Sequence, residues 1–151
     1  KGVISVEMET PLAEASKLML ENGFSGLPVI DSAGKVVGII TEYDLITKGS
    51  ALHLPTLVKL FSEYIPEKSE QSRVSGELEK KFSVTVKDVM NPEPITIQED
   101  AAIAEIINTF SEHHRVNPIP IVNSAGVLTG IVARYDIIKL YASLLNDPLK
   151  S

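Results

Sequence analysis

The stretch GLPVIDSAGKVVGIITEYDL, residues 26–45, decides how the rest of this chain is interpreted. Residues 27–30 are an apolar run rich in strand-favouring residues, and residues 36–40 are a second one. Between them Ser32-Ala33-Gly34 predicts a turn, because its glycine can take the left-handed backbone conformation that a three-residue hairpin loop needs. The polar residues after the second run begin a helix. The stretch therefore predicts strand, turn, strand and helix in succession.

The same pattern returns as NPIPIVNSAGVLTGIVARYDII at residues 117–138. Four pairs of landmark residues keep one offset of 92 residues, namely Pro28 and Pro120, Gly34 and Gly126, Gly38 and Gly130, and Asp44 and Asp136. Four matched landmarks at one offset indicate an internal duplication. The period is too long for a solenoid repeat, so it predicts two copies of one compact unit.

Each copy has a further strand and helix ahead of this stretch. In the first copy, residues 3–6 predict a short strand, and the apolar residues within 12–19 recur at helical spacing until Asn22-Gly23 stops the helix. In the second copy, residues 95–97 match that strand at an offset of 91. Because the offset later becomes 92, one extra residue lies in the loop 113–118.

These matches divide the chain into three parts. We predict a first copy at residues 1–48, a helical and polar insertion at residues 49–85, and a second copy with a closing helix at residues 86–151. Within the insertion, residues 55–65 have the apolar spacing of a helix. A short helical turn at residues 86–90 precedes the second copy and has no counterpart at the start of the chain. We therefore expect the N-terminal end of the first copy to be incomplete by comparison with the second: either the copy has lost this turn or the chain is cut ahead of it.

Neither copy can bury its own sheet. Helices cover one face of a three-stranded sheet and leave the other bare, whereas both hairpin strands are apolar along their length, which indicates burial on both faces. Packing the two sheets against each other about a pseudo-two-fold axis covers the bare faces. The predicted fold is therefore α/β (α+β), with two β-α-β-β-α units packed sheet to sheet and two related pockets in the cleft between them.

Composition narrows the range of partners. The chain has 151 residues, 44% of them hydrophobic, and a formal net charge of −6 without any basic run. We expect no nucleic-acid partner, because nucleic-acid binding needs a positive surface. We expect no membrane partner, because no apolar run reaches the ~18 residues of a membrane span. The absence of cysteine removes disulfides and thiolate metal sites and fits a cytoplasmic protein.

A resemblance to a known family rests on three segments: LPVID-SAG-KVVGIITEYDLI, IPIVN-SAG-VLTGIVARYDII, and VKDVMNPEPITI ahead of the second. In this order they resemble a tandem pair of cystathionine-β-synthase (CBS) domains, a Bateman module. The resemblance implies the β-α-β-β-α unit, a homodimer, and a regulatory role without catalysis of its own. It implies no required cofactor, but regulatory ligands that contain adenosine: AMP, ADP, ATP or S-adenosylmethionine. The protein that such a module would regulate is unknown from this sequence.

Thr41 and Asp44 are the candidate ligand residues of the first copy. In the functional interpretation, the two carboxylate oxygens of Asp44 accept both ribose hydroxyls, and Thr41 donates to a phosphate or ribose oxygen beside the positive end of the helix. The alternative is a capping box, in which both residues serve only the helix start. We favour the ligand, because the second copy keeps Asp136 although Ala133 has removed the capping hydroxyl.

We expect the two sites to be unequal. Ala133 departs from the Ser or Thr of the family and removes a hydroxyl donor from the second site, where Arg134 and Asp136 are the candidate ligand residues. Arg134 either reaches phosphate or lies at the surface, whereas Glu42 at the same place in the first copy would repel phosphate. The first site is thus expected to have the better ribose chemistry, and the second the better charge for a polyphosphate.

The resemblance also implies a base pocket made largely by backbone and apolar side chains. The matching positions of the first site are Ile4, Ser5, Gly26, Leu27 and Pro28. The matching positions of the second site are Ile95, Thr96, Pro118, Ile119 and Pro120. Their backbone groups can bond the edge of adenine, and the alternative for most of these side chains is a plain core strand.

Arg115 lies in the loop with the extra residue, where it either contacts a phosphate or is solvated. His113 and His114 beside it are a poor metal site, because adjacent side chains do not converge, so we expect no metal. We also expect no enzyme, since the sequence has no phosphate-cradling glycine loop and no triad motif. The alternative to ligand sensing is a dimerisation or interaction module with weak or vestigial pockets, which Ala133 and Glu42 motivate.

Overall fold

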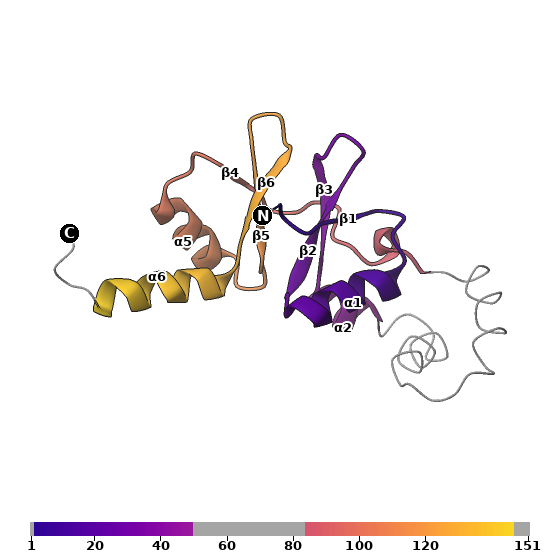
Figure 1. The fold of residues 1–151 in the computed structure, drawn as a ribbon, viewed down its shortest axis with the longest axis horizontal. Helices are drawn as coiled ribbons and strands as arrows, with labels where there is room; N and C mark the ends of the chain where they lie inside the picture. Colours follow the sequence, from indigo (N-terminus) through magenta and orange to yellow (C-terminus); the bar gives the residue numbers. More distant parts are fainter. Residues whose placement is uncertain (1, 50–83, 147–151) are drawn as a thin grey trace.

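The computed structural model describes residues 2–49 and 84–146, which form two similar halves (Figure 1). The first half contains β1 (Val6–Glu7), α1 (Leu12–Asn22), β2 (Gly26–Ile30), β3 (Val36–Thr41) and α2 (Glu42–Gly49). The second contains the 3-10 turn η1 (Val86–Asp88), β4 (Ile97–Gln98), α5 (Ile103–Glu112), β5 (Ile119–Val122), β6 (Leu128–Val132) and α6 (Arg134–Asn146). The predicted β-α-β-β-α unit is thus confirmed twice. The helix expected at residues 55–65 lies outside the described residues.

Each half builds one three-stranded sheet of the same topology. The strand order is β1-β2-β3 in one sheet and β4-β5-β6 in the other, and in both the first pair is parallel and the second antiparallel. Val6 lies opposite Val29, and Ile97 lies opposite Ile121 at the equivalent place. Figure 1 shows the two sheets next to each other at the centre, with α1 and α2 beside one and α5 and α6 beside the other.

β1 and β4 have other bounds than the strands predicted there, and a proline in each central strand accounts for the difference. Ile39, which lies opposite Pro28, directs its N–H and C=O into hydrogen bonds away from β2, so the backbone of Pro28 faces β1. Proline has no N–H to donate, and the parallel ladder begins only after it. Pro120 occupies the same place in β5. The strands expected at residues 3–6 and 95–97 are shifted accordingly to β1 and β4.

The turn that leads the second copy in the sequence completes the core of the first half. Val86 and Val89 are almost fully buried and belong to one cluster with Val6 and Leu12. The backbone N–H of Val86 donates to the carbonyl of Thr10 at 2.9 Å. The segment around η1 therefore packs with the first half, although it precedes the second copy along the chain.

The two halves meet about a pseudo-two-fold axis, through contacts that occur in equivalent pairs. The N–H of Val36 donates to the carbonyl of Gly126 at 3.1 Å, and the N–H of Leu128 donates to the carbonyl of Gly34 at 3.0 Å. The second bond is the counterpart of the first under the 92-residue offset. Reciprocal contacts of this kind are what a two-fold arrangement produces. They confirm the predicted pairing of the two units.

A close approach between the halves joins Gly26 and Pro118, which are themselves equivalent positions. A Cβ on Gly26 would lie 2.8 Å from Cδ of Pro118 and 2.8 Å from the carbonyl oxygen of Ile40. Beside them the side-chain amide of Asn117 donates to the hydroxyl of Ser25 at 3.0 Å, again between residues 92 apart. The packing of the halves therefore requires glycine at position 26.

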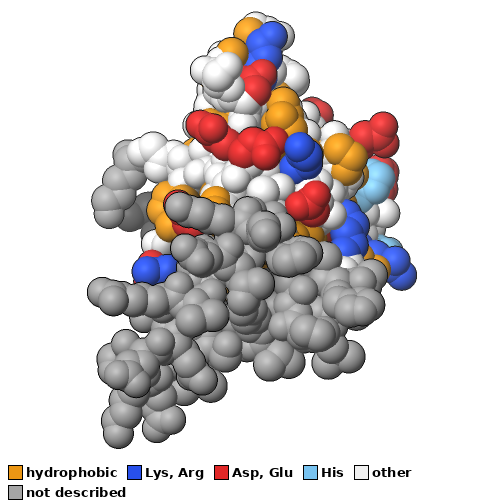
Figure 2. Space-filling model, turned by 90° about the vertical axis from the view of Figure 1, so that its right-hand side faces the viewer, with side chains coloured by type: hydrophobic (Ala, Val, Ile, Leu, Met, Phe, Trp, Pro, Cys, Tyr) orange, Lys and Arg blue, Asp and Glu red, His pale blue; other side chains and the backbone are white. Residues whose placement is uncertain are grey.

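The helices differ in how deeply they are buried. α1 buries Leu12, Ala15 and Met19 and ends at Gly23, whose φ of 64° is the left-handed stop predicted from the sequence. α6 has no buried residue. Among the described helices, none is long and apolar enough to cross a lipid bilayer. On the face drawn in Figure 2, acidic and basic side chains of the described residues are interspersed rather than gathered into one basic patch.

Gly26→Ala is expected to destabilise the protein by about 1–3 kcal/mol, because the added Cβ has no room between two rigid neighbours. Gly130→Ala is the matched control, since the nearest atoms to its added Cβ belong to the side chain of Ile121, at 3.3 Å. Urea unfolding followed by circular dichroism measures both variants. A Gly26→Ala midpoint equal to that of wild type would contradict the close contact between the halves.

Candidate functional site

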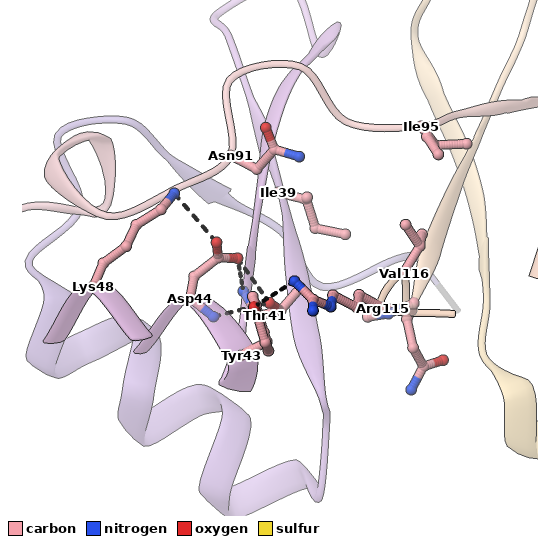
Figure 3. Close-up of a pocket in the computed structure, with 11 residues that line it drawn as sticks. Ile39, Thr41, Tyr43, Asp44, Lys48, Asn91, Ile95, Arg115 and Val116 are labelled. Atoms are coloured by element: carbon pink, nitrogen blue, oxygen red, sulfur yellow. Dashed lines mark hydrogen bonds and ion pairs between the residues drawn. The ribbon is translucent and has the colours of Figure 1, made fainter. Parts of the chain in front are cut away.

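A cavity of about 200 Å³ lies between the two halves, beside α2 (Figure 3). β3 and α2 supply one part of its lining, the segment between η1 and β4 a second, and the loop between α5 and β5 a third. The lining residues are Ile39, Thr41, Tyr43, Asp44, Lys48, Asn91, Ile95, Arg115, Val116, Asn117 and Pro118. Figure 3 shows Asp44 and Lys48 on one side and Ile95 and Val116 on the other, with Arg115 between them.

Thr41 and Asp44 form the capping box of α2. Asp44 Oδ2 accepts hydrogen bonds from the backbone N–H of Thr41 at 3.1 Å and from its hydroxyl at 2.7 Å. The N–H of Asp44 donates back to the Thr41 hydroxyl oxygen at 3.3 Å. Both residues are buried, with 8% and 7% of their surfaces exposed. The helix cap considered from the sequence is therefore present, and the same two residues line the cavity.

Lys48 engages the other carboxylate oxygen of Asp44. Its Nζ lies 3.2 Å from Asp44 Oδ1 and donates to the carbonyls of Val89 at 2.8 Å and Met90 at 3.1 Å. The lysine thus ties α2 to the segment after η1 and balances the charge of a buried carboxylate. Lys48 was not among the predicted site residues, although its spacing of four residues from Asp44 on a helix was a usable signal.

Arg115 reaches from the second half to the first. Its Nη1 donates to the hydroxyl oxygen of Tyr43 at 3.1 Å, and its guanidinium carbon lies 5.6 Å from the centre of the tyrosine ring. Arg115 and Lys48 place two cationic groups in the lining, against one carboxylate from Asp44. The cavity is therefore suited to an anionic group.

Arg134 does not belong to the lining of this cavity. Its Nη2 donates to the carbonyl of His113 at 3.1 Å and also to the carbonyl of His114. Its guanidinium carbon lies 5.8 Å from the centre of the Phe110 ring. The side chain that was to reach phosphate or lie at the surface is engaged with the loop between α5 and β5.

Asp136 keeps part of the cap without a threonine partner. Its Oδ2 accepts a hydrogen bond from the backbone N–H of Ala133 at 2.9 Å, and Lys139 Nζ lies 3.7 Å from its other oxygen. Asp136 was expected to have no capping role once Ala133 had replaced the threonine. That expectation is wrong, because the backbone N–H of residue 133 still donates to the Asp136 carboxylate. The Asp136 side chain is 51% exposed and is not part of the cavity lining.

The predicted base-pocket positions fall into two groups. Ile95 and Pro118 line the cavity. The others do not line it: Ile4, Ser5, Gly26, Leu27, Pro28, Thr96, Ile119 and Pro120. The cavity thus combines Thr41 and Asp44 of the first copy with Ile95 and Pro118 of the second, whereas each site was expected to come from a single copy. Local patterns did not reveal which parts of the two copies the pseudo-two-fold axis brings together.

Two asparagines of the lining were not selected from the sequence. The backbone of Asn91 exchanges two hydrogen bonds with Ile39, and the side chain of Asn117 bonds to both Ser25 and Arg134. Asparagines in loops are common, so no sequence signal marked them. Among the residues that the structure describes, no three His, Cys, Asp or Glu side chains gather where they would hold a metal ion.

The fold and the shared cavity define a pair of β-α-β-β-α repeats that face each other about a pseudo-two-fold axis. The sequence profile of the family described as "CBS domain" matches residues 1–50 and 86–143. The chain therefore belongs to the CBS domain family, with one repeat in each matched segment.

The curated relatives that this chain matches include longer proteins. The CBS domain-containing protein CBSX1 of Arabidopsis thaliana, a chloroplastic protein, is 28% identical over 138 residues, which cover 89% of this chain and 57% of the relative. The chain spans 31% to 57% of the length of the first three curated relatives that it matches.

Solved structures share the fold over most of their length. The CBS domain of a CBS domain-containing membrane protein from Sphaerobacter thermophilus is 30% identical, with a TM-score of 0.63 over 93% of this chain and 82% of that one. CBSX2 of Arabidopsis thaliana in complex with AMP is 22% identical, with a TM-score of 0.68 over 94% and 90%. The CBS pair of protein MJ0100, in complex with 5′-methylthioadenosine and S-adenosyl-L-methionine, is 23% identical, with a TM-score of 0.63 over 93% and 92%.

Asp44→Ala is expected to lower the free energy of unfolding by about 1–3 kcal/mol, because it removes a buried acceptor from the N–H and hydroxyl of Thr41 and the counter-charge from Lys48. Asp136→Ala is the matched control and is expected to cost less than about 1 kcal/mol, since that carboxylate is half exposed. Guanidinium unfolding of the two variants provides the comparison. Equal losses in both would show that the caps of α2 and α6 do not differ in strength.

Proposed function

We propose that this CBS pair is a regulatory, ligand-sensing module that binds an adenosine-containing ligand (AMP, ADP, ATP or S-adenosylmethionine) between its two repeats. The observation that carries the proposal is the position of Asp44, a buried carboxylate in the lining of a cavity to which both repeats contribute. A ligand bound there would contact both repeats at once. Binding would therefore change how firmly the repeats are held together, and a protein partner would sense that change.

The lining supplies each kind of contact that such a ligand needs. Ile95 and Pro118 are apolar and suit the base, Asp44 suits the ribose diol, and Arg115 suits a phosphate. Because Lys48 already engages Asp44, the ribose would share the carboxylate with it. A cavity of about 200 Å³ is smaller than the ~300–1,000 Å³ of most ligand pockets, so part of the ligand would project from it.

The ligands of two structural neighbours support the ligand class. AMP is bound in the CBSX2 crystal, and 5′-methylthioadenosine and S-adenosyl-L-methionine are bound in the MJ0100 crystal. At 22% and 23% identity these neighbours share the fold with this chain, so its own ligand is our proposal. The two cationic groups in the lining favour the phosphorylated compounds among the four.

We further propose one strong site per chain rather than two. Under the 92-residue offset Thr41 and Lys48 correspond to Ala133 and Leu140, so the equivalent second site lacks both the hydroxyl and the lysine. Arg134, for which phosphate contact and a surface position were the two alternatives in that site, bonds to backbone carbonyls. We therefore propose that the ribose and phosphate contacts belong to the same site, instead of being divided between two.

The remaining parts of the proposal concern the setting of the module. We propose that it acts in the cytoplasm as a homodimer on a protein partner, without catalysis of its own, a required cofactor or a membrane contact. The net charge of −6 and the interspersed charges on the face in Figure 2 support a module that does not bind nucleic acid.

AMP at 100 times its Kd is expected to stabilise the folded protein by roughly 2.7 kcal/mol, which a thermal-shift assay detects. Isothermal titration calorimetry is expected to give one site per chain. Asp44→Asn is expected to weaken AMP about 10-fold or more, because the ribose loses a charged acceptor.

Asp136→Asn is the matched control for this experiment and is expected to keep the wild-type affinity. The absence of any thermal shift with AMP, ADP, ATP and S-adenosylmethionine at millimolar concentration would overturn the ligand-sensing function. Two sites of equal affinity, each lost in one of the two variants, would overturn the single strong site while leaving the function in place.

The alternative is a dimerisation module with weak or vestigial pockets, and one observation favours it. α6 has no buried residue, and it exposes Ile138, Tyr141 and Leu144 over 60%, 50% and 60% of their surfaces. Removing such apolar surface from water stabilises an association, so a second copy of the chain is the partner that this alternative proposes.

If α6 forms a dimer interface, Ile138→Glu is expected to convert the dimer to a monomer in light scattering, because it would bury an unpaired charge at the contact. Ser143→Glu, an exposed position on the same helix, is the control and is expected to leave the dimer intact. A dimer that persists in Ile138→Glu would exclude this interface. A stable dimer whose calorimetric titrations show no binding of any adenosine ligand would favour the alternative over ligand sensing.

A further inference from the structure

The loop between α5 and β5 is where the second repeat departs in length from the first, and it carries Arg115 into the cavity lining. Arg115 itself is exposed, and its one hydrogen bond among the described residues goes to the hydroxyl of Tyr43. A long, exposed side chain loses considerable rotamer freedom when it is held in place. The position of its guanidinium group therefore depends on how firmly the backbone of this loop is held.

The start of the loop is held by the side chain of Arg134. Its Nη2 donates to the carbonyls of His113 and His114, the two residues immediately before Arg115. The guanidinium group lies beside the Phe110 ring, with its carbon 5.8 Å from the ring centre. α5 has no basic residue in its own last turn, so a cation from another helix meets the negative end of its dipole.

The end of the loop is held by the backbone of the same residue. The N–H of Arg134 donates to Asn117 Oδ1 at 2.9 Å, and the amide nitrogen of Asn117 donates to Ser25 of the first repeat at 3.0 Å. One residue therefore holds the loop on both sides of Arg115, through its side chain on one side and its main chain on the other. Through Asn117, the main-chain hydrogen bond of Arg134 is linked to Ser25 of the first repeat.

The first repeat has no such arrangement. Glu42 stands at the position of Arg134, and its backbone N–H donates directly to the carbonyl of Ser25 at 3.0 Å. The corresponding loop is one residue shorter and has no arginine. The arginine in the loop and the arginine that holds it thus occur together in the second repeat.

We propose that Arg134 is a positioning residue: it holds the loop so that Arg115 faces the phosphate of a bound nucleotide, and it thereby sets the preference for a phosphorylated ligand over the nucleoside. This inference rests on the proposed function of the cavity. It gives Arg134 a role in phosphate recognition through another residue, in place of the two alternatives drawn from the sequence, a direct phosphate contact or a surface position.

The test compares AMP with adenosine by isothermal titration calorimetry on the full chain. Wild type is expected to bind AMP at least about 10-fold more tightly than adenosine, and Arg115→Ala is expected to remove this difference. Arg134→Ala is expected to remove most of it while leaving the affinity for adenosine unchanged. In the variant that carries both Arg115→Ala and Arg134→Ala, AMP is expected to bind no more weakly than in Arg115→Ala alone. The reason is that the two substitutions remove the same interaction, the contact of Arg115 with the phosphate.

Lys139→Ala is the matched control, a cation on the same helix that pairs with Asp136 and is expected to keep the AMP preference. If Arg134→Ala does not fold by circular dichroism, Arg134→Gln replaces it, since its amide still donates to one carbonyl but carries no charge. An unchanged ratio of AMP to adenosine affinity, or an equal loss for both ligands, would overturn the positioning role alone. Wild type that binds neither compound would overturn the proposed function and this inference with it.

Discussion

The contact between equivalent residues of the two repeats is the constraint on which the rest of the structure depends. Two backbone hydrogen bonds join the hairpins, and Gly26 approaches Pro118 too closely to leave room for a side-chain carbon. Since the two hydrogen bonds are counterparts of each other, a shift of one repeat would break both together. The cavity exists because this pairing brings the end of β3 and the start of α2 beside the loop that precedes β5.

The segment after η1 connects this cavity to the core of the first repeat. Val86 and Val89 lie in that core, the backbone of Asn91 pairs with Ile39, and Lys48 bonds to two carbonyls of the segment. Asp44 is thus held by Lys48, and the other partners of Lys48 are the backbone carbonyls of the buried Val89 and of its neighbour Met90. A change at the cavity would therefore alter the packing of the first repeat.

The order of elements was predictable because each depends on residues that are close together in the chain. The turn at Gly34 and the helix stop at Gly23 both have the positive φ expected of them, 76° and 64°. The short first strands were predicted a few residues too early, because their bounds depend on which way the backbone of Pro28 faces, and a neighbouring strand decides that. Asp136 was misjudged for a related reason: a backbone N–H is a donor at every residue except proline, whatever the side chain.

By itself, the sequence determined the duplicated unit, the polar pair at the start of α2 and the arginine in the longer loop, since local spacing records all of these. Only the tertiary structure decided that the cavity joins Thr41 and Asp44 of one repeat to Ile95 and Pro118 of the other, and that Arg134 turns onto the loop. The contacts that bridge the two repeats at the cavity join residues 72 and 92 positions apart. No periodicity within one repeat records how it is oriented against its counterpart.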